Sequence, residues 1–113
     1  MLTVDALRTW GANVDDGLKR CLNNEAFYLK LVGKAAEDPQ FDRLKDAVAA
    51  GDLERGFELA HAMKGVTANL ALTPLEEPIR EITELLRARK EADYTALTGT
   101  ILAKRDELKK MSE

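Results

Sequence analysis

The sequence predicts an all-α protein, and three observations support this fold class. Apolar residues recur at spacings of three and four, which is the period of an amphipathic helix. No segment alternates Val, Ile or Thr with polar residues in the way that a half-buried strand does. Capping residues, prolines and a glycine stand where helices should begin and end. Because the connections are short, we expect neighbouring helices to lie antiparallel in an up-down bundle.

The N-terminal half should contain two short helical pieces and two longer helices. The pieces lie within about residues 3–21. A helix over 24–37 is predicted by a stripe of apolar residues: Phe27, Tyr28, Leu31, Val32 and Ala35. A helix over 39–50 follows, since Asp38 can cap it and Pro39 suits the first helical position. Gly51 then ends this helix.

The C-terminal half should contain three helices, over 52–71, 74–89 and 93–110. Asp52 and Asp93 are the expected caps of the first and the last. Residues 73–76, Thr-Pro-Leu-Glu, fit a capping box for the middle helix. Pro78 predicts that this helix either starts near Glu77 or is kinked. The apolar stripe of the 74–89 helix consists of Leu75, Ile79, Ile82 and Leu86. That of the 93–110 helix consists of Tyr94, Leu97, Ile101 and Leu108.

Length and composition predict one domain over residues 1–113 and exclude several function classes. The hydrophobic content of 45% supplies one core. The net charge of −3 argues against nucleic-acid binding, which needs a basic surface. No apolar run approaches the roughly 20 residues of a membrane span, and the N-terminus lacks a signal-peptide layout. The single cysteine excludes an internal disulfide, and one cysteine with one histidine argues against a zinc site. We therefore expect a cytoplasmic protein.

His61, the only histidine, should lie on the solvent side of the 52–71 helix. At 100° per residue, the apolar residues of this helix cluster almost opposite the imidazole: Leu59, Met63, Val66 and Leu70. Gly65, one turn after His61, costs about 1 kcal/mol relative to Ala in a helix interior. We interpret this glycine as removing a side chain that would crowd the imidazole. Lys64 is within reach of an anion on the ring.

Apolar side chains near His61 suggest a small docking patch. Phe57 and Leu72 should place apolar bulk on this solvated surface, with Ala68 between them and Glu58 beside His61. An exposed imidazole with space around it and a cation nearby suits a histidine that forms a covalent phosphoryl intermediate. The alternative for His61 alone is a surface residue without a role.

The segment around His61 resembles the signature of histidine phosphotransfer (HPt) domains, roughly A-H-x-L-K-G-x-x-x-N-L-G. The matching residues are Ala60, His61, Lys64, Gly65, Asn69 and Leu70. Met63 replaces the common Leu, and Ala71 stands where many members have Gly, which affects docking detail more than chemistry. The segment 17–28 also looks like the N-terminal part of the family, so the resemblance covers about residues 14–110.

The resemblance implies an antiparallel four-helix bundle with accessory N-terminal helices. It implies that His61 accepts a phosphoryl group from the phospho-aspartate of a response-regulator receiver domain, or from a hybrid histidine kinase, and relays it. Lys64 would help to hold the group, and Gly65 would leave room for it. The divalent metal of the reaction belongs to the receiver, so the chain itself needs no cofactor. A monomeric phosphocarrier without kinase activity is expected.

Two alternatives remain open from the sequence. A degenerate HPt domain could bind a signalling partner through Phe57 and Leu72 with His61 unmodified. The chain could also be an HPt domain cut from a larger kinase, although Met1 and the charged tail favour a complete small protein.

Overall fold

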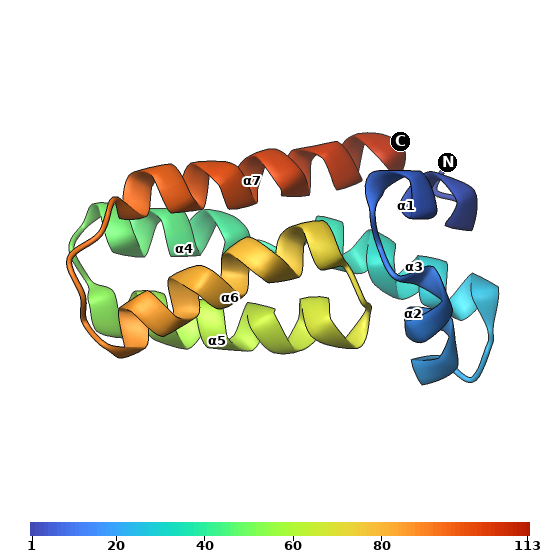
Figure 1. The fold of residues 1–113 in the computed structure, drawn as a ribbon. Helices are drawn as coiled ribbons and strands as arrows, with labels where there is room; N and C mark the ends of the chain where they lie inside the picture. The colour runs from blue at the N-terminus through green and yellow to red at the C-terminus, as the bar shows by residue number, and fades with distance from the viewer.

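The computed structural model describes residues 1–113 and consists of helices without any strand, as predicted. Figure 1 shows the helices in chain order. Their bounds are α1 Val4–Trp10, α2 Val14–Arg20, α3 Glu25–Ala36, α4 Gln40–Ala49, α5 Leu53–Asn69, α6 Thr73–Arg87 and α7 Tyr94–Met111. Each predicted helix has a counterpart, and the N-terminal region forms the two expected pieces. No helix has the length and apolar character needed to cross a membrane.

The four helices α4 to α7 pack around a common apolar core. α5 contacts α4 and α6, and α7 also contacts α4 and α6. The chain reverses direction at each connection between these helices (Figure 1). The core includes side chains from all four: Phe41, Leu44, Leu59, Met63, Leu75, Ile79, Ile82, Leu86, Ile101 and Leu108. Burial of these apolar side chains is the main force that holds the helices together.

The predicted reversal between α3 and α4 is wrong. α3 and α4 follow one another along the same side of the molecule, and α7 contacts both (Figure 1). Pro39 removes a backbone donor, yet its φ of −68° and ψ of −10° remain helical. Pro39 occupies the N-cap position of α4, one residue later than predicted, and the Asp38 carboxylate before it accepts the Gln40 N–H at 2.9 Å. A break that keeps helical dihedrals restarts the helix without turning the chain back.

The predicted capping box at the start of α6 is also wrong. Thr73 is already helical, Leu72 occupies the N-cap position, and no side chain caps this end. The Leu72 carbonyl accepts from the N–H groups of Leu75 and Glu76, both at 2.9 Å. Pro78 lies inside α6, so the helix starts before this proline. By contrast, Asp52 and Asp93 cap α5 and α7 as expected, each accepting a backbone N–H at 3.0 Å.

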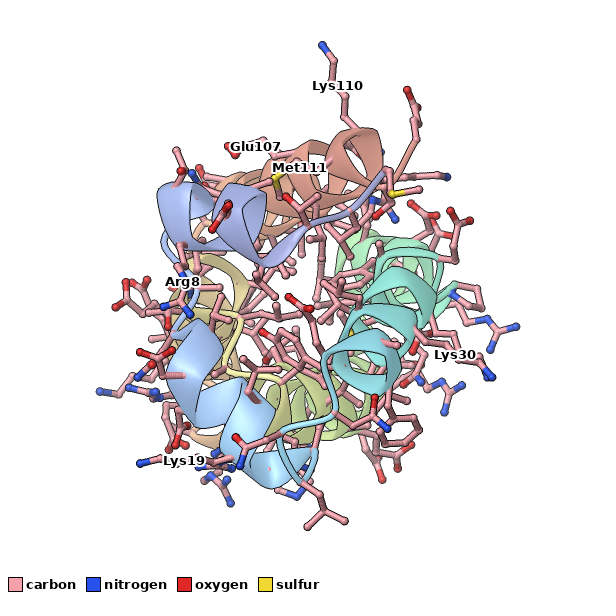
Figure 2. All side chains as sticks on the ribbon, turned by 90° about the vertical axis from the view of Figure 1, so that its right-hand side faces the viewer. Arg8, Lys19, Lys30, Glu107, Lys110 and Met111 are labelled. Atoms are coloured by element: carbon pink, nitrogen blue, oxygen red, sulfur yellow. The ribbon has the colours of Figure 1, made fainter.

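The short helices α1 and α2 lie at the end of the molecule where both termini meet (Figure 1). The terminal ammonium of Met1 donates to the Glu113 carbonyl. Figure 2 looks at this end, where Arg8, Lys19, Lys30 and Lys110 point outward around the rim. Leu7 and Val14 join the common core. The N-terminal region therefore closes one end of the apolar core.

A close contact between α2, α3 and the end of α5 fixes the N-terminal region. The buried Tyr28 hydroxyl donates to the Leu70 carbonyl at 2.9 Å. Burial raises the pKa of Tyr28 to about 12, because the phenolate would lose its hydration. Gly17 faces this pair: a Cβ there would lie 2.6 Å from the Tyr28 ring and 2.9 Å from the Leu70 oxygen.

Gly17→Ala should therefore lower the stability of the fold although Ala is the better helix former. With overlaps below 3.0 Å on a buried ring and a backbone oxygen, the cost should lie near the upper end of the usual range, about 3 kcal/mol, and so exceed the propensity gain of about 1 kcal/mol. Urea unfolding of the wild type and the variant measures this difference. Gly33→Ala in α3 is the matched control, because a Cβ there meets nothing within 4 Å and should not destabilise. A Gly17→Ala variant as stable as the wild type would contradict the close contact.

Candidate functional site

His61 lies on the exposed side of α5, as predicted. Its sequence neighbours Ala60 and Met63 are buried in the core, with exposed fractions of 0% and 2%. The imidazole makes no hydrogen bond to another group of the chain. The helix that carries it is packed against the core on its opposite side. Both ring nitrogens are therefore free to react with, or to bind, an approaching molecule.

An aromatic ring stacks on the imidazole. The ring centroids of Phe57 and His61 are 5.6 Å apart, with 21° between the planes. Phe57 is half-buried and packs against the core, so it is less exposed than expected. The guanidinium carbon of Arg87, from α6, lies 5.0 Å from the Phe57 centroid, within the range of a cation–π contact. The spacing of Phe57 and His61, one helical turn, indicates such a contact in hindsight. No sequence pattern pointed to Arg87.

Lys64 lies beside His61 on the side facing α6. In the free chain its ammonium is paired with Glu84, at 3.9 Å from Nζ to Oε1. The same carboxylate also pairs with Arg87, at 3.3 Å. Glu84 was missed by sequence reasoning, because its proximity depends on how α5 and α6 pack. The Lys64 ammonium and the Arg87 guanidinium therefore share one carboxylate partner, Glu84.

Gly65 leaves open space on the surface next to His61. A Cβ at this position would meet nothing within 4 Å. A methyl group here would therefore not touch the imidazole, and the crowding expected from a longer side chain stays a prediction. Gly56 in the same helix behaves differently, since a Cβ there would meet Val48 at 3.2 Å and Leu86 at 3.6 Å. Close packing therefore explains Gly56, whereas packing within the chain does not require a glycine at position 65.

The docking patch predicted from the sequence is only partly on the surface. Glu58 is exposed and Ala68 is half-buried, but Leu72 is completely buried. The prediction for Leu72 is wrong because α5 ends at Asn69, and Ala71, with φ of +55°, turns the chain inward. A helical wheel extended past that point no longer describes the direction of the side chain.

Val66, placed on the buried face by the helical wheel, is 39% exposed. It borders a shallow groove between α3 and α5, whose other residues include Leu31, Lys34 and Asn69. The groove lies between the two helices, so neither of them covers the Val66 side chain completely. Lys64 and the apolar Val66 therefore lie on opposite sides of Gly65 on the surface of α5.

Comparison with known proteins identifies a family for the chain. The family model described as Hpt domain matches residues 34–112. No curated protein and no solved structure shows significant similarity to the chain. The match includes α4 to α7 and His61, but not the segment 17–28, whose resemblance to the family stays a prediction. Hpt domains are phosphocarrier modules of histidine phosphorelays that interact with receiver domains and histidine kinases. The matched segment covers more than half of the chain, and the chain therefore belongs to the Hpt domain family.

Proposed function

We propose that this chain is a phosphorelay intermediate in which His61 accepts a phosphoryl group from the phospho-aspartate of one receiver domain and passes it to another. The observation that carries the proposal is the exposed imidazole, unbound by the chain, with Lys64 on one side and open space at Gly65 on the other. A nucleophile on a helix surface can reach an aspartate set in a concave site of its partner.

The transfer needs no group beyond the two proteins and the receiver's divalent metal. A neutral imidazole nitrogen of His61 attacks phosphorus, and the P–O bond to the receiver's aspartate breaks. The aspartate leaves as a carboxylate with the bonding electron pair. The imidazole gains the N–P bond and a positive charge, which it can lose by releasing the proton of its other nitrogen to water. Reversal of these steps returns the phosphoryl group to a second receiver.

The remaining expectations extend this proposal to the whole chain. We infer that α4 to α7 form the family's four-helix bundle and that α1 and α2 are accessory helices of one domain over residues 1–113. The chain would work as a monomer in the cytoplasm and would have neither kinase activity nor a cofactor of its own. Glu58 and Ala68 would contribute to the receiver contact, with Phe57 at its edge.

The alternative function is a binding module in which His61 stays unmodified. That alternative relied on an apolar face made by Phe57 and Leu72. Burial of Leu72 removes half of this face, and it equally removes Leu72 from the expected receiver contact. What supports the phosphocarrier instead is the exposed imidazole beside Lys64.

The experiment that tests the proposal is phosphoryl transfer from receiver domains of the same organism charged with acetyl phosphate. Radiolabel that appears on the chain, is lost in acid and survives base would support phosphohistidine. Well-charged receivers from which no label moves to the chain would favour the binding module.

Lys64→Ala should slow transfer by about tenfold, since a hydrogen bond to a charged group contributes about 1.5 kcal/mol. The bundle should remain folded, because Lys64 is not part of the apolar core and forms one ion pair, to Glu84. Rapid-quench transfer in both directions measures the effect. Lys45→Ala, which removes an exposed lysine of α4 that forms no ion pair, is the control. Unchanged rates for Lys64→Ala in both directions would remove its assigned role.

A further inference from the structure

Glu84 and Arg87, two charged residues of α6, lie beside the exposed side of α5 that carries His61. Glu84 pairs with Lys64 at 3.9 Å and with Arg87 at 3.3 Å, so one carboxylate joins two cations. Arg87 in turn lies over the ring of Phe57, which stacks on His61. Contacts thus run without a gap from Glu84 through Arg87 and Phe57 to the imidazole. α5 and α6 lie side by side over this length (Figure 1).

The exposure of these side chains limits what they add to stability. The side chains of Glu84 and Arg87 are 57% and 50% exposed, and exposed ion pairs contribute little to folding. Packing of the core does not require them either, since neither belongs to it. Their arrangement therefore contributes little to the stability of the fold.

We propose that Glu84 and Arg87 are positioning residues for the reaction of His61. This inference rests on the proposed phosphocarrier function. Arg87 holds the Phe57 ring by a cation–π contact, and the stacked Phe57 restricts rotation of the exposed imidazole. The reacting nitrogen is then presented in fewer orientations, which lowers the entropy lost on reaching the transition state.

Glu84 acts on the charge of the same site. Before transfer, its carboxylate neutralises part of the field of Lys64 and Arg87. A phosphoryl group on His61 brings a charge of about −1.5 to −2 and attracts Lys64 away from Glu84. Arg87 remains as the partner of Glu84, so this carboxylate is not left unpaired near the phosphoryl group. Lys64 thus exchanges the Glu84 carboxylate for the phosphoryl group. Competition from Glu84 for Lys64 makes phospho-His61 less stable.

The positioning can be tested without any phosphoryl transfer, because His61 is the only histidine. Its ring-proton NMR signals in the full chain are unambiguous and carry a ring-current shift from Phe57. Arg87→Ala should move these signals most of the way towards those of Phe57→Leu. Arg87→Lys should restore them in part, because Lys retains a cation for the aromatic ring. Arg80→Ala is the matched control, since Arg80 is an exposed arginine of α6 that pairs with Glu76 instead.

The charge effect is tested by the equilibrium of phosphoryl groups between a receiver and the chain. Glu84→Gln should shift this equilibrium towards phospho-His61 by about threefold, the size expected for one partly screened charge. Glu81→Gln, which removes an exposed carboxylate of α6 that forms no ion pair, should leave the equilibrium unchanged.

The results separate this inference from the proposed function. Ring signals that do not change in Arg87→Ala would overturn the positioning role, whether or not the chain accepts phosphate. An equilibrium that does not change in Glu84→Gln would overturn the role of the carboxylate. If no receiver phosphorylates even the wild type, the proposed function fails, and the reaction-related role of both residues fails with it. The NMR shifts would then report only a structural contact.

Discussion

The His61→Gln variant should accept no phosphoryl group at all while unfolding at nearly the same temperature as the wild type. Gln has no nucleophilic nitrogen, because the lone pair of its amide nitrogen is delocalised into the carbonyl. The exposed imidazole makes no hydrogen bond within the chain, and its only aromatic contact is the stack with Phe57. Surface substitutions of this kind usually change stability by less than about 0.5 kcal/mol.

Two measurements on the same preparations check this expectation. Transfer from a charged receiver, followed by gel separation, gives the labelled fraction, and thermal unfolding by circular dichroism gives the stability. Label on His61→Gln equal to that on the wild type would mean that another residue accepts phosphate. A melting temperature lowered by many degrees would mean that the imidazole supports the core, against its exposed position.

The features predicted correctly from the sequence depend on contacts within one helix or one turn. Asp52 caps α5 and Asp93 caps α7 because a cap bonds to N–H groups two or three residues away. The exposure of His61 follows from the period of the helix that carries it. These local rules therefore sufficed to place His61, Lys64 and Gly65 together on one surface.

The errors arose where a local rule was extended past the end of a helix or into tertiary contact. Leu72 lies beyond the end of α5, where the turn at Ala71 redirects its side chain into the core. Pro39 interrupts the helix but keeps helical dihedrals, so α4 continues along α3. Glu84 and Arg87 reach the site only because α6 packs beside α5, and one sequence without its fold gives no sign of that proximity.

The pairing of α5 with α6 links the fold to the candidate chemistry. α5 supplies His61, Lys64 and Phe57, and α6 supplies the charges that contact two of them. Both helices are anchored by fully buried side chains, including Ala60, Ile82 and Leu86. A rigid base of this kind fixes the backbone positions from which the exposed side chains of the site project.

Gly65→Leu should lower the rate of phosphoryl transfer from a receiver by about tenfold or more. The variant should remain at least as stable as the wild type. Leu is the better residue in a helix interior, by up to about 1 kcal/mol. The free chain has room for it, since a Cβ at position 65 meets nothing within 4 Å. The added side chain would instead project into the space that a receiver must enter to bring its aspartate to His61.

Gly99→Leu is the control for this variant, because Gly99 is also an exposed helical glycine whose Cβ would meet nothing within 4 Å. It lies in α7, so it should gain helix propensity in the same way without losing transfer. Initial transfer rates over a range of receiver concentrations then distinguish weaker docking from slower chemistry. A raised half-saturating concentration for Gly65→Leu alone would show that the open space serves the partner. Normal transfer by Gly65→Leu would refute this role. Gly65 would then be only a helix defect that the fold tolerates.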